Sequence, residues 1–320
     1  MNILVTGGAG FIGSHVCEAL LGKGHNICIY DNFNDYYNPQ YKRNNIQNLP
    51  IEIVEEDICN ASALDKCFSK HSFEAVIHLA AYAGVRPSID KPSLYVDANL
   101  SGTTQILECM KKYEVKKLLF ASSSSVYGNN EKAPFSEKDA VDNPISPYAA
   151  TKKAGELLCY TYHHLYNINT ACLRFFTVYG PRQRPDLAIR KFTEKIYANE
   201  PIPFYGDGSM GRDFTYIEDT VNGILLALDW VNNGTGKYEI FNLGESYPVS
   251  LSEMLKSIEL ATGKLAKVNR LPVPPGDVKL TYADISKAKN ILGYNPCTSF
   301  DAGIEKFIEW FENFRTLNLS

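Results

Sequence analysis

Three glycines near the N-terminus constrain the fold of this chain more than any other feature. The segment ILVTGGAGFIGSHV places Gly7, Gly10 and Gly13 directly after an apolar run, 2–5, and at the start of a helical pattern, 11–22. Glycine permits a tight turn between a strand and a helix, and it lets backbone N–H groups at the helix N-terminus approach a diphosphate. The pattern predicts the first strand and helix of a dinucleotide-binding sheet.

The rest of the first 180 residues repeats this alternation. Runs rich in Ile, Val and Leu predict strands, and segments with a helical apolar period predict helices. The predicted strands are 2–5, 26–30, 51–55, 74–78, 116–121 and 169–174, and the predicted helices are 11–22, 61–70, 92–113 and 147–166. Such alternation predicts an α/β fold, a doubly wound parallel (Rossmann) sheet with helices on both faces.

After residue 180 prolines and glycines cluster and the helical patterns become shorter. We expect helices at 217–230, 250–262, 284–292 and 300–314. The change predicts two domains, a dinucleotide-binding Rossmann domain at 1–180 and a smaller α/β substrate domain at 181–320. The strand-like segment 239–244 is compatible with a return to the main sheet, in which case the two domains would not be separated by a single boundary at residue 180.

An acidic residue at the end of the second predicted strand suggests which dinucleotide is bound. Asp31 follows Gly13 by 18 residues and can hold both ribose hydroxyls of NAD. Asn32 follows Asp31, and after it no Arg or Lys comes until Lys42, so no nearby cation is expected to pair with a 2′-phosphate, and NAD is favoured over NADP. Asp57 and Ile58 end the third strand, where they either border an adenine or simply begin the next helix.

Composition excludes several classes of partner. The 32 basic and 36 acidic residues give a net charge of −4 without an extended basic run, which argues against nucleic acid and anionic membranes. No apolar run approaches the ~20 residues of a membrane span, and the segment MNILVTGGAG lacks the features of a signal peptide. Eight scattered cysteines without a CxxC pair predict free thiols rather than disulfides or a metal site, and a cytoplasmic protein.

Tyr148 and Lys152 form the candidate catalytic pair. Ser146 suits a helix N-cap and Pro147 the first helical position, so the pair lies four residues apart on one helical face. Such pairs are also common on solvated surfaces, but here the pair follows a dinucleotide fold. A nearby ammonium and the positive nicotinamide ring both favour the phenolate of a tyrosine, whose ordinary pKa is about 10. Tyr148 would then remove a proton from a substrate hydroxyl while hydride leaves the same carbon.

Several motifs in order resemble the extended short-chain dehydrogenases, and among them the nucleotide-sugar epimerases. They are TGGAGFIG, HLAA at 78–81, the serine run 122–125, YAATK, and GRDFTYIED at 211–219, which together span most of the chain. The resemblance implies that Ser123 is a hydroxyl bridging Tyr148 and the substrate O4. It also implies an NAD site made of Gly7, Gly10, Phe11, Ile12, Gly13, Asp31, Asn32, Asp57, Ile58, Leu79, Ala80, Ala81, Asn99, Tyr148, Lys152 and Phe176.

The serine run discriminates among the activities in this family. Sugar-nucleotide 4,6-dehydratases have an Asp-Glu pair just before the VYG element, and UDP-glucuronate decarboxylases have a Glu there. This chain has Ser124 and Ser125, which cannot supply a carboxylic acid for elimination. The resemblance therefore implies an epimerase, in which a 4-keto intermediate is turned over and reduced again.

Two segments bear on which sugar is used. AYAGVRPS (81–88) and FFTVYGPRQRPDLAIRKF (175–192) resemble UDP-glucuronate 4-epimerases, whereas galactose epimerases typically have Asn in place of Thr177. Arg184 and Arg86 are the candidate partners for the sugar carboxylate, since a guanidinium is the best bidentate partner for a carboxylate. Either arginine could instead pin a loop or bind the diphosphate.

The same resemblance implies where the nucleotide is bound. Arg212 corresponds to a diphosphate-binding arginine, Tyr205 to an aromatic residue that stacks on the base, and Asp277 to an acid on the ribose. Many relatives have an Arg three residues before that acid, where this chain has Pro274, so the nucleotide is anchored more weakly or differently. UDP is implied by the resemblance alone.

These inferences together predict an NAD-dependent UDP-glucuronate 4-epimerase without a metal. The alternatives are a 4-epimerase of another UDP-hexose, such as UDP-galactose or a UDP-N-acetylhexosamine, and a non-catalytic NAD-binding sensor. The resemblance also suggests a homodimer formed through helices 92–113 and 147–166.

Overall fold

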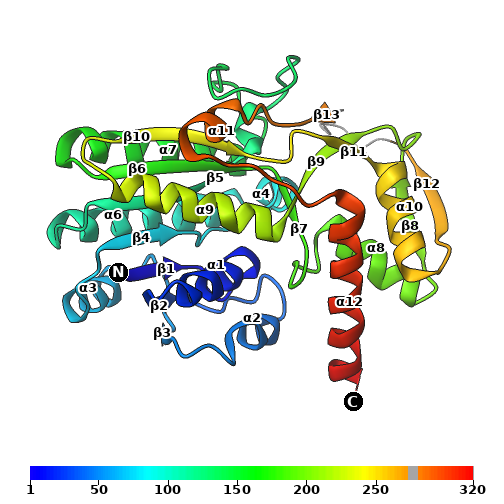
Figure 1. The fold of residues 1–320 in the computed structure, drawn as a ribbon, viewed down its shortest axis with the longest axis horizontal. Coiled ribbons are helices and arrows are strands. Elements are labelled where there is room, and N and C mark those ends of the chain that lie inside the picture. The colour runs from blue at the N-terminus through cyan, green and yellow to red at the C-terminus, as the bar shows by residue number, and fades with distance from the viewer. Residues whose placement is uncertain (273–279, 320) are drawn as a thin grey trace.

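A seven-stranded parallel sheet forms the centre of the molecule (Figure 1). The computed structural model describes residues 1–272 and 280–319. The strand order is β10-β6-β5-β4-β1-β2-β3. The strands are β1 (Asn2–Thr6), β2 (Asn26–Tyr30), β3 (Glu52–Val54), β4 (Ala75–His78), β5 (Lys117–Ser123), β6 (Asn169–Phe175) and β10 (Tyr238–Leu243). The predicted doubly wound parallel sheet is therefore confirmed, and the strand-like segment 239–244 does return to it as β10.

Helices cover both faces of this sheet because successive strand residues point in opposite directions. In β1, Ile3 and Val5 belong to one hydrophobic cluster, and Leu4 belongs to another. The first cluster includes side chains from α1 and α9, and the second includes side chains from α3, α6 and α7. These helices are α1 (Phe11–Gly22), α3 (Ala61–Lys70), α6 (Thr103–Lys112), α7 (Pro147–Tyr166) and α9 (Ile217–Asn232). A short helix, α2 (Pro39–Ile46), packs beside α1.

The helix predicted at 92–113 is interrupted in the structure. It consists of α5 (Pro92–Val96), a π-helical turn η1 (Asp97–Gly102) and α6. A π turn inserts an extra residue into a helix and re-aims its side chains, a change that an apolar period in the sequence does not reveal. The interruption lies beside α7, which carries the candidate catalytic pair.

The remaining strands form two small sheets at one end of the main sheet (right side of Figure 1). One sheet contains β7 (Thr177–Tyr179), β9 (Gly211–Tyr216), β11 (Pro248–Ser250) and β13 (Leu280–Thr281), and the other contains β8 (Pro201–Tyr205) and β12 (Lys267–Leu271). The helices of this region are α8 (Ala188–Tyr197), α10 (Leu251–Thr262), α11 (Ser286–Leu292) and α12 (Phe300–Leu319). The helices predicted at 250–262, 284–292 and 300–314 correspond to α10, α11 and α12, but strands this short carry too few residues to show a period.

The chain passes between the two parts more than once. β7 pairs with β9 in the small sheet, and β10 later pairs with β6 in the main sheet. A division of the chain into two domains at residue 180 remains a prediction.

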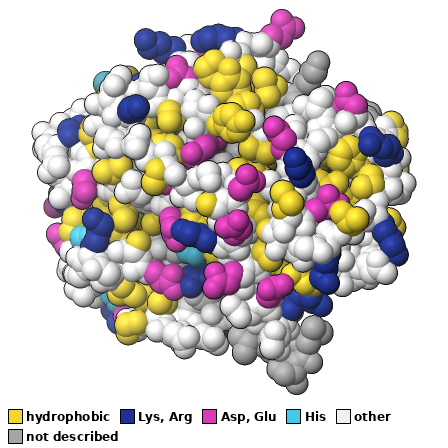
Figure 2. All heavy atoms as spheres, turned by 45° about the vertical axis from the view of Figure 1, so that its right-hand side comes forward, with side chains coloured by type: hydrophobic (Ala, Val, Ile, Leu, Met, Phe, Trp, Pro, Cys, Tyr) yellow, Lys and Arg dark blue, Asp and Glu magenta, His cyan; other side chains and the backbone are white. Residues whose placement is uncertain are grey.

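Charged side chains of both signs are interspersed on the face that Figure 2 shows. On this face, and among the side chains that are described, Lys and Arg are scattered rather than gathered into one basic patch. This distribution agrees with the net charge of −4. Within the described ranges, no helix is both long enough and apolar enough to cross a membrane.

His78, at the end of β4, is a buried histidine that links the sheet to α6. Its Nδ1 is 2.7 Å from Thr6 Oγ1 and its Nε2 is 2.9 Å from Thr103 Oγ1. Burial, followed by the charge of Lys152, lowers the pKa of His78 from 6.5 to about 3. The native state therefore holds His78 neutral, and the unfolded chain takes up a proton as the pH falls below 6.5.

We expect this histidine to make the protein sensitive to acid. Between pH 7 and pH 5 the unfolded chain binds more protons than the native state, so His78 alone lowers the free energy of unfolding by about 2 kcal/mol. His78→Asn should be less stable at pH 7 but should lose about 2 kcal/mol less than the wild type over this range, as measured by urea denaturation. Parallel losses in the two proteins would contradict the assignment.

Candidate active site

A cavity of about 680 Å³ opens at the carboxyl ends of the main-sheet strands. Its wall includes residues that follow β1, β2, β4 and β5, and it also includes Thr177, Arg212 and Thr281 from the small sheet. Ligands of open α/β sheets bind at this edge of the sheet, and the volume lies within the range of small-molecule sites. The cavity is therefore the candidate active site.

The glycine turn forms one end of the cavity. Gly7 has φ +70°, and a Cβ at Gly7 would lie 2.7 Å from the backbone nitrogen of Ala80. A Cβ at Gly13 would lie 2.2 Å from the carbonyl oxygen of Gly7, so this glycine lets α1 pack against the turn. The N-cap residue of α1 is Gly10, which has no side chain to cap the helix, and the first turn contains no acid. The N–H groups at this helix end, lined by Phe11 and Ile12, can therefore receive an anion.

Asp31 lies in the cavity wall next to this turn. Its carboxylate accepts hydrogen bonds from the backbone N–H groups of Ala9 and Phe33, at 3.2 and 3.0 Å. Lys42 Nζ lies 4.0 Å from Asp31 and donates to Asn34 at 3.0 Å, so the expectation that no cation is near Asp31 is wrong. Lys42 lies in α2, and this helix brings its side chain back to Asp31. Because this ammonium is already paired with Asp31 and Asn34, the site still offers a ribose acceptor rather than a free cation.

The ends of β3 and β4 complete this half of the wall. Asn32 Nδ2 donates to Asp57 Oδ2 at 2.6 Å, and Asp57 and Ile58 line the cavity. Leu79, Ala80 and Ala81 line it as well.

Asn99 was expected to contact the cofactor, but it does not line the cavity. It is buried in η1, where its amide exchanges hydrogen bonds with the backbone of Tyr82 and donates to Thr151 Oγ1 at 3.1 Å. Its observed contacts hold the loop after β4 against α7.

The four serines of the run have different surroundings. Ser122 is buried and donates to Glu156 at 2.7 Å. Ser123 accepts a hydrogen bond from the N–H of Ser125 and is hydrogen-bonded to Tyr148. Ser124 begins a short 3-10 helix, η2 (Ser124–Tyr127), and lines the cavity. Ser125 also lines the cavity, and its buried Oγ has no hydrogen-bond partner among the described residues, which suits a polar ligand.

Tyr148 and Lys152 lie beside Ser123 because α7 packs closely on β5. A Cβ at Gly155 would lie 2.4 Å from the ring of Phe120, so only glycine permits this approach. Ser146 caps the helix by accepting from the N–H of Ala149, as its sequence predicted. Both Tyr148 and Lys152 line the cavity.

The charges around Tyr148 differ from the expectation. Burial raises the pKa of Tyr148, and the hydrogen bond with Ser123 and the charge of Arg184 oppose this rise. The Lys152 ammonium donates to the carbonyl of Ala121 at 2.7 Å, and burial lowers the pKa of Lys152 to about 8. In this structure Ser123 and Arg184, rather than Lys152, are therefore the groups that favour the phenolate.

A buried polar network behind the serine run could not be found from the sequence. Arg174 Nε and Nη2 donate to the two carboxylate oxygens of Glu156 at 2.8 and 2.9 Å. The Arg174 guanidinium lies 4.8 Å from the ring of Tyr127, whose hydroxyl donates to Asn242 at 2.6 Å. The network joins β5, η2, α7, β6 and β10, and it contains ordinary residue types at unrelated sequence positions.

An aromatic wall surrounds the other side of Tyr148, and the sequence did not predict it either. The Tyr95 ring lies 6.1 Å from that of Tyr148, and Tyr82 links Tyr95 to Tyr36 through further ring contacts. Tyr36 and Tyr95 both donate to the carbonyl of Ala83, at 2.9 and 3.1 Å. These residues come from three separate segments that only the fold brings together.

Arg184 lines the cavity and stands 5.5 Å from the centre of the Tyr36 ring. Its Nε and Nη2 donate to the carboxylate of Asp186 at 2.9 and 2.8 Å. One edge of the guanidinium thus pins its own loop, one of the alternatives left open by the sequence. Its charge nevertheless acts on Tyr148, which places it at the catalytic end of the cavity.

The remaining candidates lie toward the small sheets. Arg86, Phe176, Thr177 and Arg212 line the cavity. Tyr205 is not part of the cavity wall, but Arg86 lies 5.7 Å above its ring and connects α4 (Val85–Asp90) with β8. Asp277 and Pro274 lie outside the described residues.

The carboxylates that line this cavity lie at one end of it. Among the described lining residues, the acids are Asp31, Glu56 and Asp57, all at the ends of β2 and β3. Lys42 pairs with Asp31 at this end, whereas Lys152, Arg184, Arg86 and Arg212 lie toward β5 and the small sheet. The end that contains Tyr148 can therefore bind anions and exchange a proton through a phenol.

Comparison with known proteins agrees with this fold. The family model described as GDP-mannose 4,6 dehydratase matches residues 4–307. A UDP-glucuronate 4-epimerase of Thermodesulfobacterium geofontis is 46% identical over 312 residues, which cover 96% of this chain and 95% of that protein.

Two solved structures are similar over the whole fold. The UDP-glucuronic acid 4-epimerase of Bacillus cereus, in complex with UDP-glucuronic acid and NAD, has a TM-score of 0.91 and 39% identity, with 98% of this chain and 100% of that chain covered. The UDP-glucose 4-epimerase of Thermotoga maritima, with UDP-glucose, has a TM-score of 0.90 and 34% identity at the same coverage. The chain belongs to the family that the GDP-mannose 4,6 dehydratase model describes.

Proposed function

We propose that this chain is an NAD-dependent UDP-glucuronate 4-epimerase, which interconverts UDP-glucuronate and UDP-galacturonate. The observation that carries the proposal is the position of the lining carboxylates at the end of the cavity away from Tyr148. Elimination of a sugar hydroxyl needs a carboxylic acid near Tyr148, but the acids among the described lining residues lie at the other end. Serine hydroxyls and arginine side chains surround Tyr148 instead, which supports oxidation and reduction of a hydroxyl beside a bound carboxylate.

The glycine turn and Asp31 fit NAD. The close approach of Gly7 to Ala80 leaves no room for a side chain, and the first turn of α1 offers uncapped N–H groups for a diphosphate. Asp31 is positioned to accept from ribose hydroxyls. When bound, the nicotinamide supplies a reversible two-electron acceptor and a positive charge near Tyr148.

Side chains of this protein would then transfer one proton between the sugar hydroxyl and Tyr148. Tyr148 as phenolate removes the proton of the sugar 4-hydroxyl, and Ser123 relays the hydrogen bond between them. Lys152, with a pKa of about 8, is mostly an ammonium at neutral pH and donates a hydrogen bond to the carbonyl of Ala121 in β5. After the 4-keto sugar has turned over, its C4 would take up hydride on the opposite face while Tyr148 returns a proton to the 4-oxygen.

Holding the carboxylate is a separate task. Oxidation at C4 produces a β-keto acid, which loses CO₂ readily when the bond to the carboxylate aligns with the carbonyl π system. We propose that Arg184 and the hydroxyls of Ser124, Ser125 and Thr177 hold this bond near the carbonyl plane. The unpartnered Ser125 Oγ supports this role.

The nucleotide half of the substrate is proposed to bind toward the small sheets. Arg212 would contact the diphosphate, and Arg86, backed by Tyr205, would border the base. The role proposed for Asp277 rests on resemblance alone.

We also propose a cytoplasmic homodimer formed through α6 and α7. Leu157, Tyr160 and Leu165 on α7 are exposed to 57%, 52% and 57%, while Cys159 and Gly155 face the core. An exposed apolar stripe on an otherwise packed helix is typical of an interface. The free thiols of the cysteines support a reducing compartment.

The direct test is to mix the purified protein with UDP-glucuronate and follow products by NMR. We expect UDP-galacturonate to form without consumption of added cofactor, and denatured protein to release NAD. Formation of product only from UDP-glucose or UDP-N-acetylglucosamine would favour the second candidate, another UDP-hexose 4-epimerase, which the Thermotoga maritima likeness supports. Bound NAD without turnover of any sugar would indicate a sensor.

Removal of the Tyr148 hydroxyl should remove most of the epimerase activity. Tyr148→Phe is expected to lower kcat by at least ~100–10,000-fold, since it removes the general base and acid, while substrate binding is largely retained. Tyr95→Phe is a matched control in the aromatic wall, because its hydroxyl bonds the Ala83 carbonyl rather than Ser123. Turnover near the wild-type rate in Tyr148→Phe would place the base elsewhere.

Arg184 should determine the preference for a carboxylated sugar. A charge-assisted hydrogen bond contributes about 1.5–3 kcal/mol, so Arg184→Ala should lower the ratio of kcat/KM for UDP-glucuronate to that for UDP-glucose roughly 10–100-fold. The ratio cancels the effect of Arg184 on the pKa of Tyr148, which both substrates share. The share of decarboxylated pentose product should also rise.

Asp186→Asn is the control for loop geometry. It removes the ion pair with Asp186 but leaves the guanidinium, so the preference for UDP-glucuronate should persist. An equal loss of both substrates in Arg184→Ala would show that Arg184 only pins the loop.

A further inference from the structure

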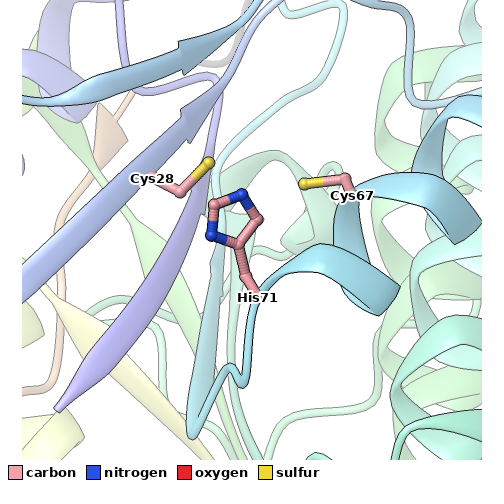
Figure 3. A group of neighbouring side chains, drawn as sticks. All are labelled: Cys28, Cys67 and His71. Carbon is pink, nitrogen blue, oxygen red and sulfur yellow. The ribbon is translucent and has the colours of Figure 1, made fainter.

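Three side chains with metal-binding atoms meet at the outer edge of the main sheet, away from the cavity (Figure 3). Cys28 lies in β2, Cys67 in α3, and His71 directly after α3. The two sulfur atoms and one imidazole nitrogen lie within 4.8 Å of one another. The group could not be predicted from the sequence, because Cys28 is far along the chain from the other two residues and no CxxC motif is present.

The imidazole is aimed into this group. Figure 3 shows one ring nitrogen of His71 pointing between the sulfur atoms of Cys28 and Cys67. His71 Nε2 is buried and makes no well-aligned hydrogen bond among the described residues, although Glu52 Oε1 lies 3.4 Å from it. Phe73 stacks on the ring at 5.2 Å and fixes its orientation. A buried nitrogen without a well-aligned partner costs free energy, so a ligand at this point would satisfy it.

The spacing is close to that of a tetrahedral zinc site. Zn–S bonds of about 2.3 Å and Zn–N bonds of about 2.0 Å place neighbouring ligand atoms roughly 3.5–3.8 Å apart. From separations of up to 4.8 Å, the three atoms need to approach one another by at most about 1.3 Å to meet this geometry, which side-chain rotation can supply. Two thiolates and an imidazole are the donors that Zn²⁺ prefers.

A fourth ligand is within reach. Glu52, in β3, pairs with Cys28 in the sheet, and its Oε1 lies 3.4 Å from His71 Nε2. Glu52 also forms an ion pair with Lys70. Two thiolates, one carboxylate, Zn²⁺ and the Lys70 ammonium sum to zero charge, so the ion would not leave a net charge in a partly buried place.

We propose that Cys28, Cys67 and His71, with Glu52 as fourth ligand, form a structural Zn²⁺ site. The ion clamps α3 to β2 and β3, the edge of the sheet that ends in Asp31 and Asp57. Binding displaces one proton from each thiol, and His71 binds the ion through Nε2. His71 and Glu52 are exposed to 19% and 45%, which gives the ion a path from solvent.

The site is separate from the proposed catalytic chemistry. None of Cys28, Cys67, His71 or Glu52 lines the cavity. Removal of the ion should therefore leave kcat nearly unchanged and act on stability.

Metal content and cobalt spectroscopy of the full chain test the proposal. Protein purified without chelator should contain one Zn²⁺ per chain by elemental analysis, and Co²⁺ added to chelator-treated protein should produce thiolate-to-cobalt charge-transfer absorption. Added Zn²⁺ should raise Tm by several degrees at about 100-fold excess over Kd. Because two thiol protons are displaced, the association constant should fall up to about 100-fold per pH unit where both thiols are protonated.

Cys67→Ser should lower Zn²⁺ affinity at least about 100-fold and remove the cobalt band, since a serine hydroxyl stays protonated at neutral pH. Cys109→Ser is the matched control, because Cys109 is a buried thiol on α6 outside the group. The proposal is overturned if metal is absent and Zn²⁺ does not change Tm, or if both variants lose metal equally. A Cys28–Cys67 disulfide found by alkylation and mass spectrometry of the purified protein would also overturn it.

Discussion

The candidate site depends on one buried ion pair, Glu156 with Arg174. Glu156 belongs to α7 and Arg174 to β6, and Ser122 at the end of β5 donates to the same carboxylate. The pair therefore fixes the helix that carries Tyr148 relative to the strand that carries Ser123. Loss of one partner would leave a buried charge without compensation, at a cost of about 3–5 kcal/mol. Close packing of Gly155 on Phe120 sets the distance between the same two elements, and the ion pair sets their register.

The features that the sequence predicted well are those produced by local chemistry. Gly7 needs a positive φ, Ser146 caps a helix, and Tyr148 and Lys152 are four residues apart, so neighbours in the sequence are enough to indicate each role. Long apolar strands such as β5 and β6 were equally clear, since both faces are buried and the runs are continuous. The position of Asp31 followed from the end of β2.

Features that depend on contacts between distant segments were missed. The π turn at Asp97–Gly102 arises from how α5 and α6 pack beside α7, and an apolar period cannot show it. Lys42 seemed too far along the chain to matter, but α2 folds it back to Asp31. Arg184 was predicted at the site, whereas its pairing with Asp186 required the loop geometry. Cys28 and Cys67 meet only because α3 covers the edge of the sheet beside β2.

The arrangement of charge explains how a fold shared with dehydratases suits epimerisation. Along the cavity, carboxylates stand where ribose hydroxyls are proposed to bind, and cations stand where phosphates and a sugar carboxylate are proposed to bind. A carboxylic acid beside Tyr148 would face Lys152 and Arg184 and would lose its proton, unless burial raised its pKa. With serines at positions 124 and 125, this chain has no such acid there, and no group beside Tyr148 has to stay protonated next to these cations. The phenol is then the proposed proton carrier, and Arg184, whose charge opposes the rise in the pKa of Tyr148, is proposed to join recognition of the carboxylate to activation of the base.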